Sequence, residues 1–155
     1  KGYTEPDPRE DLSGMDVARK ILILSREIGL KLEFSDITID KIIPQACEEA
    51  PTVEAFFDEL DKANAYFENM VNTAHAENKV LRYIAKLENQ KISIGLRAVG
   101  SDHPFYQMDG ADNVIAFTTK RYHDRPLVIK GPGAGAEVTA SGVFADIVSI
   151  GSHLS

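Results

Sequence analysis

The apolar residues of this chain change their spacing along the sequence, and that change limits the possible folds more than any other feature. Between Ser13 and Gly29 they recur at helical intervals, which predicts an amphipathic helix that buries Val17, Ile21, Leu24 and Ile28. Between Lys91 and Val99 they alternate with other residues, which predicts a half-buried strand with one face formed by Ile92, Ile94, Leu96 and Ala98. The chain must therefore pack helices on a sheet.

Both ends of the first predicted helix carry recognisable signals. Ser13 is a favourable N-cap, and Asp16 stands three residues later, where the acidic partner of a capping box belongs. Gly29 offers a stop at the other end. The preceding stretch, Gly2–Arg9, cannot be helical throughout, because it contains three turn or loop formers: Pro6, Asp7 and Pro8.

The remaining elements are predicted from the same patterns. We expect, in order, a strand over Lys31–Ile39, a helix from Pro51 to about Phe67, a helix over Met70–Leu87, strands over Asn113–Thr119 and Arg125–Lys130, and a helix over Glu137–Ile150. Because helices and strands interleave unevenly, the pattern favours an α+β fold, with a mixed β-sheet covered by helices, over a regular doubly wound sheet.

Composition bounds the class of protein. The 155 residues suffice for one domain with a core, and 43% hydrophobic and 26% charged residues are typical of globular proteins. No apolar run is long enough for a transmembrane helix, and the polar stretch Lys1–Glu10 lacks the pattern of a secretory signal. A net charge of −7 argues against non-specific binding to nucleic acid or to anionic membranes.

Cysteine and histidine form no metal pattern in the sequence. The single Cys47 cannot form an internal disulfide, no C-x-x-C pair is present for zinc, and the four histidines are scattered. We therefore expect no metal site in this chain and a reducing, cytoplasmic setting. Because the chain begins at Lys1, inside a motif-like stretch, we interpret it as a piece of a longer polypeptide.

A glycine loop lies between a predicted strand and a predicted helix. Residues 131–136, Gly-Pro-Gly-Ala-Gly-Ala, fit the dinucleotide pattern G-x-G-x-x-G/A, but only 20 residues follow Gly135. That fold needs a further strand with an acidic residue about 20 positions on. Two interpretations remain: a plain turn that needs positive φ at one glycine, or a helix N-terminus that approaches an anion or a polar ligand. The pattern alone favours the turn.

Acidic residues crowd the N-terminal loop, and a lysine follows them. Asp16 and Lys20 are spaced i, i+4, so a carboxylate and an ammonium group lie side by side on one helix face. We expect Lys20 to be partly buried beside the apolar stripe, as suits a lysine used in acid–base chemistry. The alternative is a surface ion pair worth only about 0.3–0.5 kcal/mol, and spacing alone favours it.

Two long motifs at opposite ends of the chain resemble those of homoserine dehydrogenases. The first is residues 2–20, GYTEPDPREDLSGMDVARK, and the second is residues 130–146, KGPGAGAEVTASGVFAD. Their order and length make the match specific. The sequence most resembles the dehydrogenase half of bifunctional aspartokinase/homoserine dehydrogenases. The resemblance implies interconversion of L-aspartate 4-semialdehyde and L-homoserine with NADPH or NADH, in the route to threonine, methionine and isoleucine.

The resemblance also implies a role for each motif residue. Lys20 corresponds to the proton donor to the carbonyl oxygen. Asp16 and Glu5 correspond to acids that hold the substrate amine, and Asp11 is a further active-site acid. The other implied contacts are the wall of the substrate pocket, at Gly2, Tyr3 and Thr4, and the cofactor, at Gly133 and Gly135.

In this family the dinucleotide-binding fold, a monovalent-cation loop and a second active-site lysine lie upstream of these motifs. The resemblance therefore implies that residues 1–155 form the substrate-binding and dimerisation domain. The helix at residues 136–150 would pack on the nucleotide-binding domain, and a homodimer would form through the sheet. We expect the isolated chain to be inactive.

Two other classes of function remain open. The chain could act as an assembly module whose sheet builds a dimer while its site is idle, and sedimentation would test that reading in part. It could instead be a ligand-sensing domain whose acidic loop binds an amino acid as an effector. Saturable homoserine binding without catalysis in the longer polypeptide would favour the sensor.

Overall fold

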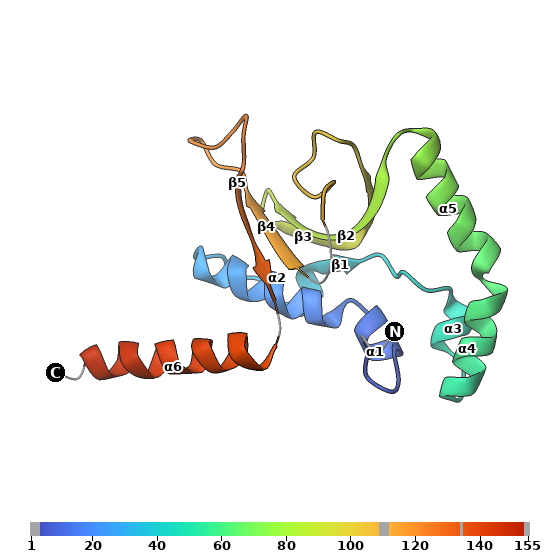
Figure 1. The fold of residues 1–155 in the computed structure, drawn as a ribbon, viewed down its shortest axis with the longest axis horizontal. Helices are drawn as coiled ribbons and strands as arrows, with labels where there is room; N and C mark the ends of the chain where they lie inside the picture. The colour runs from blue at the N-terminus through green and yellow to red at the C-terminus, as the bar shows by residue number, and fades with distance from the viewer. Residues whose placement is uncertain (1–3, 109–111, 134, 154–155) are drawn as a thin grey trace. The chain divides into compact units, whose positions relative to one another are not determined.

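The structure is a computed structural model that describes residues 4–108, 112–133 and 135–153. The chain divides into two compact units, Lys1–Gly100 and Ser101–Ser155, and each contains a small sheet of its own (Figure 1). Together the units hold helices and a sheet with both parallel and antiparallel pairs, which confirms the predicted α+β class. Within the described residues, no helix is long and apolar enough to cross a membrane.

The first unit consists mainly of helices followed by a hairpin. Its elements are α1 (Arg9–Leu12), α2 (Met15–Glu27), the 3-10 turn η1 (Phe34–Asp36), β1 (Ile37–Ile39), α3 (Gln45–Glu48), α4 (Val53–Lys62), α5 (Asn64–Ala76), β2 (Val80–Glu88) and β3 (Lys91–Val99). The strand order is β1-β3-β2, with β1 parallel and β2 antiparallel to β3.

The hairpin between β2 and β3 closes with a tight turn. Asn89 and Gln90 both have positive φ, 49° and 60°, as a two-residue type I′ turn requires. This turn sets the register Glu88 opposite Lys91 and Val80 opposite Val99. The predicted helix over Met70–Leu87 is therefore wrong beyond Ala76, because the β-branched and aromatic run from Val80 pairs along its length with β3.

Helix α2 covers one face of this sheet. Its buried apolar residues, Ala18 and Leu22, form one core cluster with Ile92 and Ile94 of β3. The predicted stripe is thus rotated: Val17 and Ile21 flank the cluster, whereas Ile28 is 65% exposed. In β3, Ile92 and Ile94 are buried as predicted, but Ala98 is exposed.

The two ends of α2 differ in how well they were predicted. At the C-terminus, Gly29 has φ 87°, and the Gly29 and Leu30 N–H groups donate to Arg26 and Ser25 carbonyls, a Schellman motif that confirms the predicted stop. At the N-terminus, the predicted capping box of Ser13 with Asp16 is wrong. Gly14, with φ 80°, is the residue before the helix.

Two other predicted elements are shorter in the structure. The strand predicted over Lys31–Ile39 is strand only at Ile37–Ile39, because Glu33 and Asp36 cap η1 with each other's backbone and bend the chain. The helix predicted from Pro51 begins at Val53, where the Thr52 hydroxyl accepts the Ala55 N–H at 3.1 Å. It ends at Lys62, and α5 begins after Ala63.

A second cluster forms the core of the α3–α4 segment. Its buried members are Ile43, Cys47, Ala50 and Phe56, and Leu12 of α1 packs against them. Because this cluster receives a residue from α1, the segment supports the N-terminal loop as well as its own helices.

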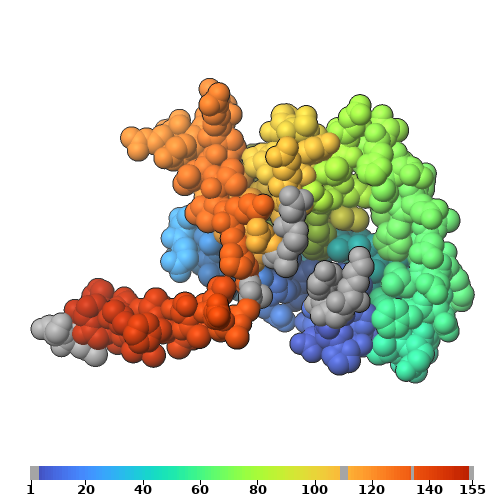
Figure 2. Space-filling view, viewed as in Figure 1, coloured from blue at the N-terminus to red at the C-terminus, as the bar shows by residue number. Residues whose placement is uncertain are grey.

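The second unit is a hairpin followed by a helix. Strand β4 (Asp112–Phe117) pairs antiparallel with β5 (Leu127–Pro132), and α6 (Ala136–His153) follows. The three elements predicted here exist, with ends shifted by a few residues. Figure 2 shows α6 in red in the space-filling view. Its large apolar residues are exposed along its length: Val138, Val143, Phe144, Ile147, Val148 and Ile150.

Candidate active site

The acidic loop, residues 4–13, is held by its own polar groups. Pro8, whose φ of −76° suits a helix start, precedes the single turn of α1, and its carbonyl accepts the Leu12 N–H at 3.0 Å. The Asp11 carboxylate then accepts the Glu5 N–H at 3.1 Å. This hydrogen bond joins the backbone of one predicted site acid, Glu5, to the side chain of another, Asp11. The side chains of both residues are exposed to solvent.

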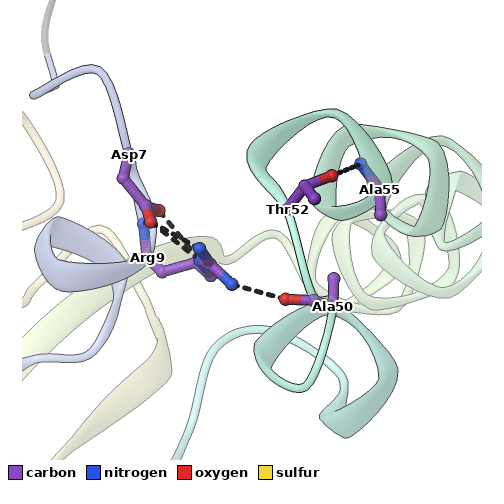
Figure 3. Close-up of polar contacts among 5 residues, drawn as sticks. All are labelled: Asp7, Arg9, Ala50, Thr52 and Ala55. Carbon is purple, nitrogen blue, oxygen red and sulfur yellow. Dashed lines mark hydrogen bonds and ion pairs between the residues drawn. The ribbon is translucent and has the colours of Figure 1, made fainter.

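An arginine anchors this loop to the α3–α4 segment (Figure 3). The Arg9 guanidinium donates to both Asp7 carboxylate oxygens, at distances from 2.5 to 3.1 Å, and its Nη1 donates to the Ala50 carbonyl at 2.6 Å. The hydrogen bonds from the Arg9 side chain, and then from its backbone N–H, lower the pKa of the Asp7 carboxyl. Asp7 is therefore held as a carboxylate, and it orients the Arg9 guanidinium toward Ala50.

The Asp16–Lys20 ion pair forms as the i, i+4 spacing predicts. Lys20 Nζ lies 2.9 Å from Asp16 Oδ2, and the two side chains are 54% and 65% exposed. The expectation that Lys20 is partly buried is wrong, because the helix turns Ala18 and Leu22 toward the sheet instead. An exposed ammonium group beside one carboxylate can meet a small solute and donate a proton to it.

The structure brings the predicted site residues together in two pairs. Within the described residues, no hydrogen bond or ion pair joins Glu5 and Asp11 to Asp16 and Lys20. An ion pair links α1 to α2 instead: Arg19 Nη2 lies 3.6 Å from the Glu10 carboxylate. Of the predicted pocket wall, Thr4 is exposed, whereas Gly2 and Tyr3 lie outside the described residues.

The glycine loop belongs to the second unit and has the strand-to-helix form that its pattern favours. Gly135, with φ 136°, precedes α6 and accepts the Thr139 N–H at 3.0 Å. Among the described residues, a Cβ at Gly135 would meet nothing within 4 Å, which leaves space for a ligand to approach this position. At Gly133 a Cβ would overlap the Asn113 side chain, which would have to move to admit it.

The hollows of the first unit lie away from the predicted residues. One of about 450 Å³ is lined in part by Cys47 and Tyr66, and one of about 400 Å³ in part by Lys86 and Ser93. Burial, and then the charge of Glu59, raises the pKa of the Cys47 thiol, which disfavours the thiolate needed of a nucleophile. Within the described ranges, no group of three His, Cys, Asp or Glu side chains is placed to hold a metal ion.

Sequence reasoning missed three residues that shape this region. Arg9 could have been noticed as a basic residue among the carboxylates of the N-terminal loop. Gly14 was visible as a glycine directly after the predicted N-cap Ser13. Tyr83 carried no signal, because its hydroxyl reaches Gly14 only through the pairing of β2 with β3. Burial, and then the charge of Asp40, raises the pKa of this phenol.

Comparison with known proteins identifies relatives over nearly the whole chain. The family model for homoserine dehydrogenase matches residues 1–148. A bifunctional aspartokinase/homoserine dehydrogenase from Zea mays is 49% identical over 155 residues, which cover 99% of this chain and 17% of the relative. The chain thus spans about a sixth of that relative.

Solved structures share the fold. A Candida auris protein described as being of unknown function has a TM-score of 0.91 and 44% identity, over 97% of this chain and 43% of that one. A putative homoserine dehydrogenase from Archaeoglobus fulgidus has a TM-score of 0.69 and 28% identity, over 96% of this chain and 39% of that one.

Proposed function

This chain belongs to the homoserine dehydrogenase family, and on that premise we propose that it is the substrate-binding and dimerisation part of an NAD(P)-dependent oxidoreductase. The reaction would interconvert L-aspartate 4-semialdehyde and L-homoserine, in the route to threonine, methionine and isoleucine. The observation that carries the proposal is the exposed Asp16–Lys20 pair on α2, which follows directly on a loop rich in carboxylates.

Lys20 would supply the proton of the reduction. When bound, a nicotinamide cofactor would supply the hydride for reduction of the aldehyde, and negative charge would then develop on the aldehyde oxygen. The Lys20 ammonium group would donate its proton to that oxygen and complete the alcohol, and in the reverse direction it would take the proton back. Asp16, at 2.9 Å, would hold the ammonium group in position.

The acidic residues would recognise the ammonium group that substrate and product share. Glu5 and Asp16 would bind it, with Asp11 as a further acid, while Thr4, together with Gly2 and Tyr3, would form the pocket wall. Charged hydrogen bonds of this kind are the stronger ones in proteins, and several carboxylates around one amine give specificity for amino acids over simple aldehydes. In support, Asp11 holds the backbone of Glu5, so the loop keeps a defined shape.

The cofactor would be bound mainly by residues outside this chain. Gly135, with Gly133 beside it, would touch the cofactor at the start of α6, and the open space at Gly135 fits that contact. Residues 136–150 of α6 would pack on the nucleotide-binding domain, and the exposed apolar side chains there support this. A homodimer would form through the sheet.

Further parts of the proposal concern the longer polypeptide. A monovalent cation would bind upstream, an aspartokinase would be fused to the enzyme, and the protein would work in the cytoplasm without nucleic acid or membrane partners. The isolated chain would neither bind the cofactor tightly nor turn over.

The test uses the longer polypeptide with its upstream region and follows homoserine-dependent reduction of NADP and of NAD. Lys20→Met should abolish turnover while the fold stays intact. Lys62→Met is the matched control, because Lys62 also forms an exposed ion pair on a helix, 2.7 Å from Glu59. Turnover that persists in Lys20→Met would move the proton transfer to another group, and no turnover in the wild type would overturn the enzymatic proposal.

A further inference from the structure

Gly14 joins the acidic loop to α2 in a conformation that few other residues adopt. Its φ is 80°, in the left-handed region, and it is buried. The Gly14 carbonyl accepts the Ala18 N–H at 2.9 Å, so α2 begins directly at this residue. Asp16 and Lys20 lie in the first two turns that follow.

The space where a Gly14 side chain would stand is already filled. A Cβ at Gly14 would overlap the hydroxyl of Tyr83 and would lie 3.3 Å from both Tyr83 Cζ and Ile39 Cγ2. The Tyr83 hydroxyl is buried and has no hydrogen-bond partner in the described part of the chain. The hydroxyl therefore acts here through steric contact: the start of α2 packs directly against it.

This contact joins the start of α2 to β2, an edge strand of the sheet. Tyr83 stands on β2 opposite Leu96, and it packs against the cluster of Ala18, Leu22, Ile92 and Ile94. A displacement at Gly14 would pass along the helix to the exposed Asp16–Lys20 pair, because hydrogen bonds keep a helix stiff over two turns.

We propose that the contact between Gly14 and the Tyr83 hydroxyl sets the position of Asp16 and Lys20, which makes Tyr83 a positioning residue for the proton transfer. This inference rests on the proposed function. It assigns no contact between Tyr83 and substrate: Tyr83 acts through Gly14 and α2.

Gly29 provides an internal control at the other end of the same helix. Its φ is 87°, so alanine there meets the same backbone strain as alanine at Gly14. A Cβ at Gly29, however, meets nothing within 4 Å. A comparison of the alanine variants at the two glycines therefore separates the effect of backbone strain from the effect of the steric contact.

The experiment compares Gly14→Ala, Gly29→Ala, Tyr83→Phe and Gly14→Ala/Tyr83→Phe in the longer polypeptide, at a temperature where each is folded. Gly14→Ala should lower kcat by about 100-fold, the cost of a misplaced catalytic group, with a smaller change in KM. Gly29→Ala should keep kcat near the wild-type value, whereas Tyr83→Phe, which removes the hydroxyl in contact with Gly14, should lower kcat by a smaller factor than Gly14→Ala. The double variant should recover part of the loss, because removal of the hydroxyl makes room for the methyl group.

A second readout does not depend on turnover. The rate at which a small amine-acylating reagent modifies Lys20, followed by mass spectrometry, should change in Gly14→Ala, return toward wild type in the double variant, and stay unchanged in Gly29→Ala. An inactive wild type would overturn the proposed function, while this labelling pattern would still decide the positioning.

Three outcomes would overturn the inference: equal kcat in folded Gly14→Ala and Gly29→Ala, no recovery in the double variant, or identical Lys20 labelling in all variants. If Gly14→Ala does not fold, Tyr83→Leu replaces it, with Leu87→Ala as control, because both shorten a side chain of β2 against the same cluster. The inference then requires a loss of kcat in Tyr83→Leu and not in Leu87→Ala.

Discussion

Arg9 Nη1 donates a 2.6 Å hydrogen bond to the carbonyl oxygen of Ala50, which lies 41 residues further along the chain. The same guanidinium is held by Asp7, and Ala50 is a buried member of the second core cluster. The acidic loop is therefore tied to the α3–α4 segment, and its shape depends on residues far from it in sequence.

Loss of the Arg9 anchor should loosen the acidic loop. Arg9→Met removes the side-chain donors to Asp7 and to the Ala50 carbonyl, so amide hydrogen exchange should become faster in residues 5–12. Arg26→Met is the matched control, because Arg26 donates to the Leu32 carbonyl at 3.1 Å and to Glu33 at 2.8 Å, within its own neighbourhood. Equal exchange of residues 5–12 in wild type and Arg9→Met would contradict the anchoring role. In the longer polypeptide we also expect Arg9→Met to raise KM for homoserine.

Acid should weaken the same anchor. The pKa of Asp7 is lowered by the Arg9 side-chain hydrogen bond and then by the Arg9 N–H, so the folded state favours the carboxylate. The resulting stability is present above about pH 4, near the unfolded pKa, and is lost as the pH falls through the lowered folded pKa. The difference in urea midpoint between wild type and Asp7→Asn should therefore shrink in that acidic range. A difference that stays constant with pH would show that Asp7 does not titrate as we expect.

The Tyr83 hydroxyl should contribute nothing favourable to folding. Because it is buried without a partner in the described structure, Tyr83→Phe should leave the free energy of unfolding unchanged or raise it by up to about 1 kcal/mol. Burial, and then Asp40, raises the pKa of the phenol, so stability should be complete below about pH 10 and fall as the pH rises above it. Urea unfolding from neutral to alkaline pH checks both points. Tyr83→Phe should lose this alkaline decline, and a clear loss of stability at neutral pH would contradict the prediction.

Two adjacent phenylalanines should differ widely in their effect on stability. Phe56 is 0% exposed in the second core cluster, whereas Phe57, next to it in α4, is 50% exposed. Phe56→Ala should lower the free energy of unfolding by about 3–5 kcal/mol through a cavity. Phe57→Ala should change it by less than about 1 kcal/mol. Denaturant unfolding of both variants measures the contrast. Similar losses of unfolding free energy would show that Phe57 is buried in the core, which would contradict the structure.

The elements that could be predicted were those whose signals are local. The stop at Gly29, the alternation that buries Ile92 and Ile94, and the i, i+4 pairing of Asp16 with Lys20 depend on residues within a few positions of each other. The strand β2 could not be predicted in this way, because its apolar residues also fit a helical spacing. Pairing with β3, through the turn at Asn89 and Gln90, decided between the two.

The amino-acid sequence by itself determined the α+β class, the family, and the acids and lysine that are candidates for the chemistry, because motifs and hydrophobic periods are properties of neighbouring residues. Only the tertiary structure decided that Lys20 is exposed, that Arg9 reaches Ala50, and that Tyr83 fills the space beside Gly14. The physical reason is that each of these contacts depends on how α2, the α3–α4 segment and the sheet pack. That packing is a balance of burial and sterics between residues distant in the chain.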